Sequence, residues 1–366
     1  METYKLSDLC EILDSKRKPL SALQRAKKQG IYPYYGAQGI IDHLDDYLLD
    51  GEYLLVAEDG ANLETRNQPI ANIAKGKIWV NNHAHVLGSN GKCPLNLLGF
   101  ILNNMNISPY VTGCAQPKLN QENLRNIEIE LPSHIDSIAS ILSSLDRKIE
   151  LNNKINADLE EMAQAIFKNW FVDFEPFKDG KFVDSELGMI PEGWKVGLLG
   201  ELCNFKRGKN LLTKNAIDEG VPVVAGGLEP SCYHNIANTG APVITVSGSG
   251  ANAGFMRMYH VPVWASDCSF IDISCENFYF VYCFLKVNSK LLKHAQTGAV
   301  QPHVKPSDIH DFELVIPDEE SIYDFQDKVK PFFDRIASLQ KENSRLSSLR
   351  DTLLPRLMSG ELEVPE

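Results

Sequence analysis

Two copies of one motif decide the fold of this chain: Gly-Cys-Ala-Gln-Pro-Lys-Leu at residues 113–119 and Gly-Ala-Val-Gln-Pro-His-Val at residues 298–304. The glutamines of the two copies are 301 − 116 = 185 residues apart, and at the same shift Trp79 falls on Trp264. A period this long exceeds the roughly 20 to 50 residues of solenoid repeats, so each copy should be a whole domain with its own core. The repeat predicts two similar domains and a target that is recognised twice.

Three further stretches align at slightly longer shifts, which small loop insertions explain. They are residues 35–37 with 225–227, residues 60–62 with 250–252, and residues 9–10 with 202–203.

Composition agrees with a protein of two or three packed domains, because the chain has 366 residues and is 43% hydrophobic. Its first residues lead into no apolar signal core, and no run approaches the roughly 18 apolar residues of a membrane span. We therefore expect a cytoplasmic protein. The eight cysteines contain no Cys-x-x-Cys pair, so we expect reduced core thiols rather than a zinc site.

The formal net charge of −12 argues against a nucleic-acid binder, but the distribution of charge weakens this objection. Each repeat opens with a basic stretch: Lys16, Arg17, Lys18, Arg25, Lys27 and Lys28 in the first, and Lys206, Arg207, Lys209 and Lys214 in the second. A local basic face can bind phosphate while the remaining surface is acidic. The alternative is that these are ordinary solvated lysines and arginines.

Two long helical patterns lie between and after the repeated domains. The first has a heptad seam of Ile138, Leu145, Asn152, Leu159 and Ile166, with Ile141, Ile155 and Met162 three positions further on. The second has Val329, Ile336, Asn343 and Arg350, with Phe332, Leu339, Leu346 and Leu353 between them. Such seams predict helices that pack lengthwise. At about 1.5 Å per residue, some 35 residues make a rod of roughly 50 Å, which suits a spacer rather than a pocket.

One asparagine stands in each seam, and 343 − 152 = 191 is close to the repeat shift. A buried polar residue in such a seam can set the register of the two helices. The alternative is that Asn152 and Asn343 face solvent or other partners.

The remaining sequence reads as strands with short helices. We expect strands near residues 53–57, 77–80, 84–87, 126–131, 242–246, 261–264 and 312–316, and helices in matching places at residues 95–103 and 278–287.

No familiar catalytic motif occurs. The sequence lacks a phosphate loop, a His-Glu-x-x-His pair and a Gly-x-Ser-x-Gly elbow. The glycine-rich residues 248–254 correspond to residues 58–62, where two carboxylates would repel phosphate, so we interpret them as a turn. His83 and His85 could bind a metal or act as acid and base. We do not expect catalysis, because no carboxylate is near them in sequence and the aligned position is Cys268.

Other polar side chains fit recognition better. Asn81, Asn82 and His83 follow Trp79, whereas Ser266 and Asp267 follow Trp264, so the framework repeats while the side chains differ. Asn, Gln, Arg and Lys can read base edges through paired hydrogen bonds. For the two tryptophans themselves we favour burial in the core.

Four stretches together resemble a known family. Residues 144–152 and 165–174, residues 185–194 at the start of the second half and residues 353–362 near the end are similar to conserved regions of type I restriction-modification specificity subunits. The resemblance spans essentially the whole chain.

The resemblance implies an α+β fold with two mixed α/β target recognition domains, residues 1–132 and 176–317. A central helical spacer (133–175) and a distal one (318–366) would form a long antiparallel coiled coil, related by a pseudo-two-fold internal repeat. Such a subunit binds an asymmetric bipartite DNA site and docks two methyltransferase subunits and restriction subunits. The partners use S-adenosylmethionine, ATP and Mg²⁺, and this chain is expected to hold no cofactor or metal and to be non-catalytic.

Two sets of site residues follow. The expected DNA contacts are Lys16, Arg17, Lys18, Tyr34, Lys75, Lys77, Asn81, Asn82, His83, Gln116, Lys118, Lys206, Arg207, Lys209, Lys214, His234, Arg257, Tyr259, Gln301, His303 and Lys305. The expected partner-docking residues are Leu145, Asn152, Leu159, Phe167, Trp170, Phe171, Ile336, Asn343, Leu346 and Leu353.

Two other interpretations stay open. A specificity subunit of a related two-part restriction enzyme would show the same architecture. A coiled-coil adaptor that binds protein at both ends, and no DNA, would also explain the long helices.

Overall fold

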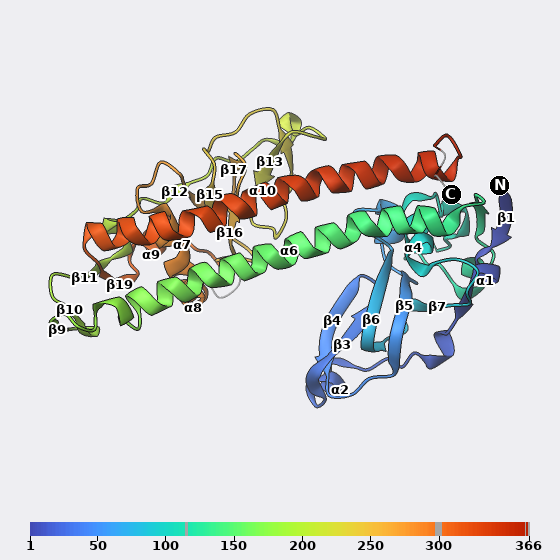
Figure 1. Ribbon diagram of the computed structural model, residues 1–366, viewed down its shortest axis with the longest axis horizontal. Helices are drawn as coiled ribbons and strands as arrows, with labels where there is room; N and C mark the ends of the chain where they lie inside the picture. Colours follow the sequence, from blue (N-terminus) through green and yellow to red (C-terminus); the bar gives the residue numbers. More distant parts are fainter. Residues whose placement is uncertain (114–115, 297–301, 363, 365–366) are drawn as a thin grey trace. The chain divides into compact units, whose positions relative to one another are not determined.

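The computed structural model describes residues 1–113, 116–296, 302–362 and 364, and divides into two compact units (Figure 1). Unit 1 is Met1–Leu151 with Asn343–Glu366, and unit 2 is Asn152–Glu342. The two long helices, α6 (Ile135–Phe171) and α10 (Glu319–Met358), each give one segment to each unit. Among the helices of the described residues, none is long and apolar enough to cross a membrane.

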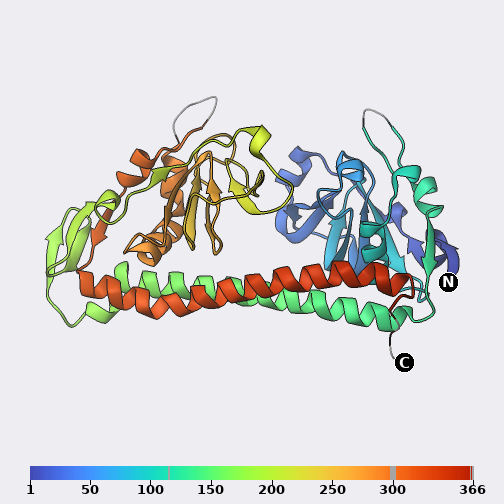
Figure 2. The same ribbon diagram turned by 90° about the horizontal axis from the view of Figure 1, so that it is seen from above.

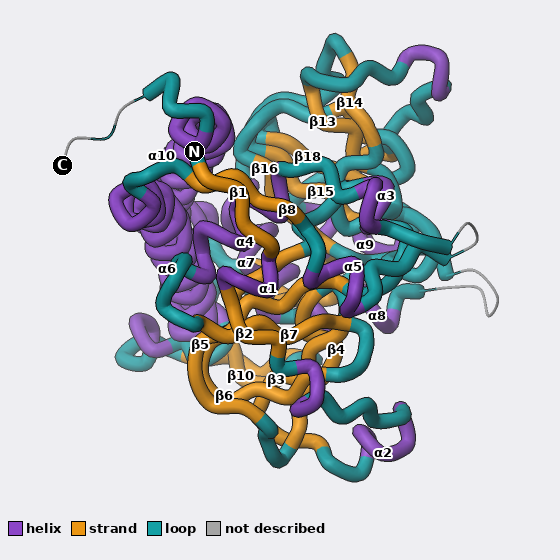
Figure 3. The backbone as a smooth tube through the Cα atoms, turned by 90° about the vertical axis from the view of Figure 1, so that its right-hand side faces the viewer, coloured by secondary structure: helices purple, strands orange, loops and turns teal. Residues whose placement is uncertain are grey.

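Unit 1 is built on a six-stranded sheet, coloured orange in Figure 3. Its strand order is β2 (Cys10–Ile12), β7 (Ala84–Ser89), β5 (Leu49–Ala57), β6 (Ala71–Val80), β3 (Gln29–Gly36) and β4 (Gly39–Leu44). Neighbours pair antiparallel except β3 and β6, which are parallel.

Strand β5 carries apolar side chains on both sides, and burying them requires other parts of unit 1 to cover both faces of the sheet. Leu54 and Val56 belong to one buried cluster and Leu55 to another, as the two-residue period of a strand requires. Helix α4 (Leu95–Asn104) packs on the first face. There a Cβ built on Gly99 would lie 3.0 Å from a methyl of Leu54, so glycine permits the close approach.

The rest of unit 1 consists of short elements around this sheet. They are the antiparallel pair β1 (Glu2–Lys5) and β8 (Glu128–Leu131), the helices α1 (Leu6–Leu9), α2 (Ala22–Ala26), α3 (Asn62–Thr65) and α5 (Gln121–Arg125), and the 3₁₀ turns η1 (Asp14–Lys16) and η2 (Ser108–Tyr110).

The described residues of unit 2 form four smaller sheets. One orders β12 (Lys206–Arg207), β18 (Cys268–Asp272), β15 (Val243–Ser247) and β16 (Met256–Tyr259), and a second orders β14 (Cys232–His234), β13 (Val221–Val224) and β17 (Trp264–Ala265). The others pair β11 (Lys195–Leu198) with β19 (Glu313–Ile316) and β9 (Phe182–Ser185) with β10 (Gly188–Pro191). Its helices are α7 (Phe278–Val287), α8 (Ser289–His294) and α9 (Pro306–His310), and its 3₁₀ turns are η3 (Glu175–Phe177), η4 (Leu199–Glu201) and η5 (Thr213–Asn215).

In each unit the segments of α6 and α10 lie side by side and join the core (Figure 2). In unit 1, Arg350 and Asp146 form an ion pair at 2.7 Å. In unit 2, the Asn152 amide donates to Glu342 at 2.9 Å, and the rings of Phe167 and Phe325 are 5.7 Å apart. Within unit 2 the two helices therefore run in opposite directions.

Corresponding hydrogen bonds recur in the two units. Gly60 N donates to Pro117 O at 3.1 Å in unit 1, and Gly250 N donates to Pro302 O at 3.1 Å in unit 2. The indole of Trp79 donates to Lys18 O at 2.7 Å, and that of Trp264 donates to Lys209 O at 2.8 Å. Both tryptophans stand on strands that pair parallel with a neighbour. The two units therefore share a local framework.

The strands and helices expected from the sequence are largely present. The helices at 95–103 and 278–287 are α4 and α7, and every expected strand overlaps an observed one. The strand expected at 261–264 is mostly wrong, because β17 begins only at Trp264. Trp79 is buried as expected, at 3% exposed, whereas Trp264 is half-buried.

One part of the expected helical seam is wrong. Ile141, Ile155 and Met162 are 36%, 39% and 49% exposed. The buried positions of α6 include instead Leu142, Ala163 and Phe167, which pack on their own unit as well as on α10. A heptad pattern assumes a second helix as the only neighbour, whereas here a folded unit also determines which side is covered.

The cysteines in the described residues are free, and five of them are buried: Cys10, Cys93, Cys203, Cys268 and Cys283. Burial raises the pKa of the Cys10 thiol to about 12. Cys114 lies outside the described residues.

Candidate nucleic-acid interface

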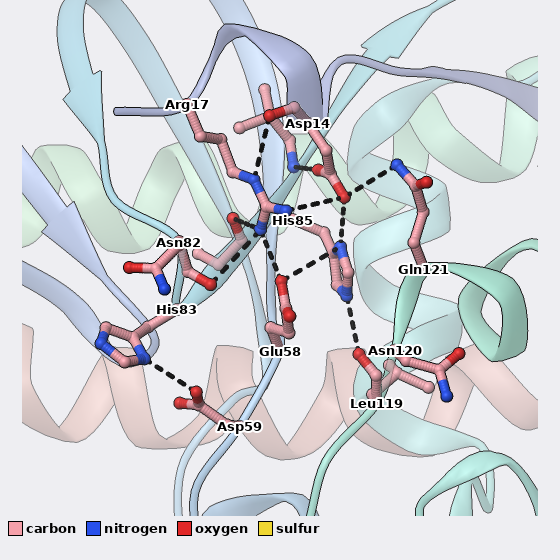
Figure 4. A network of polar contacts seen from close by, with 12 residues as sticks. Asp14, Arg17, Glu58, Asp59, Asn82, His83, His85, Leu119, Asn120 and Gln121 are labelled. Atoms are coloured by element: carbon pink, nitrogen blue, oxygen red, sulfur yellow. Dashed lines mark hydrogen bonds and ion pairs between the residues drawn. The ribbon is translucent and has the colours of Figure 1, made fainter. Parts of the chain in front are cut away.

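A network of charged side chains lies under the loops of unit 1 (Figure 4). His85 is fully buried on β7, with Nδ1 2.6 Å from Asp14 Oδ2 and Nε2 2.7 Å from Leu119 O. Both neighbours are hydrogen-bond acceptors, so both bonds form only when each ring nitrogen carries a proton. The His85 imidazole therefore bridges the Asp14 carboxylate and the backbone of Leu119.

Arg17 and Lys118 complete the network. The Arg17 guanidinium lies 2.6 Å from Glu58 and 3.2 Å from Asp14, and the Lys118 ammonium lies 3.2 Å from Glu58. Burial opposes ionisation of Glu58, but its hydrogen bonds from Arg17 and Lys118 and the nearby charge of His85 hold its pKa below the ordinary value. Burial is the largest single influence on Asp14 and also opposes its ionisation. The hydrogen bond and charge of His85, the hydrogen bond from Val86 N and the charge of Arg17 together outweigh burial, so the pKa of Asp14 is lowered.

This cluster does not fit a metal site. One ligand atom each from Asp14, Glu58 and His85 lie within 4.8 Å of one another. However, both ring nitrogens of His85 already face acceptors, and both carboxylates already form ion pairs with Arg17. A cation would have to displace these partners, so the cluster is better explained as a structural ion network.

The fold corrects the sequence argument about the histidines. No carboxylate is near them in the chain, yet the exposed His83 lies 2.7 Å from Asp59 and His85 lies against Asp14. The alignment with Cys268 is also shifted. Strand pairing sets Ala57 opposite Ala84 in unit 1 and Ser247 opposite Cys268 in unit 2. Cys268 therefore corresponds to Ala84, and Ser269 takes the place of His85.

The network draws together four surface segments of unit 1: residues 16–18, 58–60, 82–83 and 116–118. Arg17 also donates to Ala84 O at 2.9 Å, and Lys118 N donates to Thr112 O at 2.7 Å. The exposed predicted contacts on these segments are Lys16, Lys18, Asn82, His83, Gln116 and Lys118. They gather on one part of unit 1, although they are up to 102 residues apart in sequence (118 − 16 = 102).

Several predicted contacts of unit 1 have other roles. Tyr34 is 1% exposed, and its hydroxyl accepts from Leu20 N at 2.9 Å. Asn81 is 4% exposed, and its side chain accepts from His83 N at 2.8 Å. For these two residues the prediction of a DNA contact is wrong, because buried side chains that bond the backbone shape the loop instead. Arg17 is only 14% exposed and belongs mainly to the network.

Lys75 and Lys77 stand apart from the four segments, in the middle of β6. Lys75 pairs with Glu52 at 3.3 Å, and the Lys77 ammonium lies 4.8 Å from the ring centre of Tyr47. Both side chains are exposed.

In unit 2 three predicted contacts line one pocket. Arg207, His303 and Lys305 surround a pocket of about 400 Å³ together with Gly248, Pro306 and Ser307. Arg207 also pairs with Asp267, whose other carboxylate oxygen accepts from the Ser249 hydroxyl. Lys206, Lys209 and Lys214 are exposed on neighbouring loops and on β12.

The other predicted contacts of unit 2 are dispersed. His234 is 8% exposed and its ring centre lies 4.7 Å from that of Trp264, so its prediction as a DNA contact is wrong because the ring packs within the unit. Arg257 lies 3.0 Å from Glu229 and over the half-buried ring of Tyr259 at 5.1 Å. Gln301 lies outside the described residues.

Four of the predicted partner-docking residues are core residues. Asn152, Phe167, Phe171 and Ile336 are no more than 7% exposed within unit 2, so their side chains are not available to another protein. Leu145, Leu159, Trp170, Asn343, Leu346 and Leu353 are half-buried.

The geometry defines a class of protein in which two units of one framework present different polar loops. The family model of the type I restriction modification DNA specificity domain matches residues 1–161 and 191–346. The chain belongs to this family.

Named relatives agree with this assignment. The chain is 32% identical over 280 residues to the type I restriction enzyme MjaIX specificity subunit of Methanocaldococcus jannaschii, covering 69% of this chain and 65% of that protein, slightly under two thirds of its length. It is 26% identical over 336 residues to the HindI specificity subunit of Haemophilus influenzae, covering 67% and 71%. The crystal structure of a type I S subunit from M. genitalium has the same fold, with a TM-score of 0.58, 18% identity and coverage of 100% and 96%.

Proposed function

We propose that this chain is the DNA sequence-specificity subunit of a type I restriction-modification enzyme, and that each unit contacts one half of an asymmetric bipartite site. The observation that carries the proposal is that four corresponding loop segments meet in both units but hold different side chains. In unit 2 these are residues 207–209, which correspond to residues 14–18 of unit 1, together with 248–250, 266–267 and 302–303. A common framework with different polar loops suits two readers of different half-sites.

The long helices are proposed to act as an antiparallel coiled-coil spacer, with a pseudo-two-fold relation between the repeats. A roughly 50 Å rod is long enough for half-sites near one turn of DNA, about 34 Å apart. The opposite directions of α6 and α10 in unit 2 support this proposal.

We further propose that two methyltransferase subunits dock on this chain, that restriction subunits complete the enzyme, and that these partners use S-adenosylmethionine, ATP and Mg²⁺. The chain itself is proposed to be non-catalytic and cytoplasmic. Apolar side chains left exposed on α6, such as Ile155 and Met162 in unit 2, are candidate docking positions.

The test is genome-wide mapping of adenine methylation in a host that expresses this chain with and without its neighbouring methyltransferase. A bipartite motif that appears only when both are present supports the proposal. A motif that does not change with the chain, although the methyltransferase is active with another specificity subunit, refutes it and favours the protein-binding adaptor. A partner with a fused nuclease would identify the related two-part enzyme.

A further inference from the structure

The two units differ in charge at one point of their shared framework. In unit 1, Leu119 N donates to Glu58 O at 2.8 Å, and in unit 2, Val304 N donates to Gly248 O at 3.1 Å. Gly248 therefore occupies the place of Glu58, whose carboxylate accepts from Arg17 and Lys118 in unit 1.

A second carboxylate is replaced by an arginine. Arg207 pairs with Ser269 across β12 and β18, and Ser269 corresponds to His85. In unit 1, Leu13 N donates to Val86 O at 2.7 Å, which sets the next residue, Asp14, opposite His85. Arg207 therefore takes the place of Asp14.

Because Gly248 has no side chain, the guanidinium of Arg207 can lie against its Cα. A Cβ built on Gly248 would overlap the Arg207 guanidinium, with its Cζ only 2.9 Å away. In unit 1 the carboxylate of Glu58 fills the corresponding place. In unit 2 the space opens into the 400 Å³ pocket lined by Arg207, His303, Lys305 and Ser307.

The remaining charges leave this pocket basic. Asp267 pairs with Arg207 from outside the pocket lining. Asp308 accepts from the backbone N of Lys305 at 2.8 Å. No partner of the Lys305 ammonium is found in the part of the chain that the structure describes. An anion entering the pocket would lie beside the guanidinium of Arg207, the ammonium of Lys305 and the imidazole of His303, and such groups are usual donors to phosphate. The Ser307 hydroxyl is not counted among these donors, because it already donates to Asp308 Oδ1 at 3.3 Å.

We propose that this pocket binds one phosphodiester of the DNA backbone in the half-site contacted by unit 2. In the described residues of unit 1 the equivalent place is occupied by the Glu58 carboxylate, which supplies the anion from within the protein. The inference rests on the proposed function and adds an asymmetry to it. The same framework position contacts a DNA phosphate in unit 2 and forms ion pairs within the protein in unit 1.

The experiment measures binding of the full chain, copurified with its methyltransferase subunits, to its methylation site in duplexes that carry one neutral methylphosphonate linkage at a time. Lys305→Gln removes the ammonium group from the pocket and leaves Arg207 in place. Lys195→Gln, on β11 of the same unit, removes an exposed charge outside it and serves as the matched control.

We expect one linkage in the unit 2 half-site whose neutralisation weakens binding roughly tenfold in the wild-type protein and the control, and has no effect in Lys305→Gln. The slope of log affinity against log salt should fall by about 0.9 in Lys305→Gln only. If Lys305→Gln lost as much affinity as the wild-type protein at every neutralised linkage, the proposed phosphate site would be refuted. If wild-type protein bound no bipartite sequence, the proposed function itself would fail.

A second variant reproduces unit 1 in unit 2. In Gly248→Glu the new carboxylate can pair with Arg207, since the overlapping atoms belong to the far end of a flexible side chain. The Gly248→Glu variant should bind DNA with the same affinity whether or not that one linkage is neutral, and its recognition of the other half-site should not change. Inorganic phosphate that competes with the DNA in wild type but no longer competes in Lys305→Gln would support the pocket. Equal competition in the two proteins would show that free phosphate binds elsewhere.

Discussion

Replacing His85 by serine tests whether the buried network holds the loops of unit 1. Serine is the residue that unit 2 has at this place, so the change is sterically compatible with the framework. His85 is fully buried and makes two hydrogen bonds, 2.6 Å to Asp14 and 2.7 Å to Leu119 O. Asp14 keeps Arg17 at 3.2 Å, whereas the Leu119 carbonyl loses its imidazole donor.

The expected loss of stability is about 3 kcal/mol, from two buried bonds worth roughly 1–3 kcal/mol each. Hydrogen exchange followed by mass spectrometry reports on each unit separately. We expect protection of residues 84–89 to fall about a hundredfold, at about 1.4 kcal/mol per factor of ten, while residues 268–272 in unit 2 do not change.

The matched control is His43→Ser, which alters an exposed histidine on β4 of the same unit. It should leave both peptides unchanged. Equal protection of residues 84–89 in His85→Ser and wild type would show that the network contributes little to holding the loops, and the structural interpretation would have to be abandoned.

Three further predictions follow from the structure. Because the pKa values of Asp14 and Glu58 are lowered, their ionised carboxylates stabilise unit 1 above the ordinary carboxyl range. The urea concentration at the unfolding midpoint should therefore fall as the pH falls from about 5 to about 3, and should fall less steeply in Asp14→Asn. Parallel plots of midpoint against pH for the two proteins would contradict this. Exchange of residues 1–132 with those of a relative should alter one half of the methylated motif only, and a change in both halves would show that the units are not independent. In native protein near pH 8, iodoacetamide should modify the half-buried Cys232 well before the buried Cys10, whose pKa is about 12; equal labelling by mass spectrometry would refute the described burial.

Sequence alone identified the repeat and most secondary structure because those features depend on local pattern. The aligned tryptophans are equivalent in the structure, since both indoles donate to the carbonyl of a corresponding lysine, and α4 and α7 follow from apolar runs of helical length. The charged network escaped detection because His85 and Asp14 are 71 residues apart.

Small differences in loop length also limited the sequence argument. One residue fewer between Trp264 and β18 shifts the alignment, so that Cys268 was compared with His83 rather than Ala84. Likewise residues 35–37 align one position off, since parallel pairing sets Tyr35 beside Val80 and Val224 beside Ala265. Only the strand register reveals which residues are equivalent, and the replacement of Asp14 by Arg207 depends on that register.

The division of the chain has a consequence for synthesis. Unit 2 is continuous, from Asn152 to Glu342, whereas unit 1 combines Met1–Leu151 with Asn343–Glu366. Leu354 and Leu357 from the late segment are buried in the same core as Leu6 and Leu9 from the early one. A ribosome therefore releases every residue of unit 2 before unit 1 can close its core, so the half translated first is the half that finishes folding last.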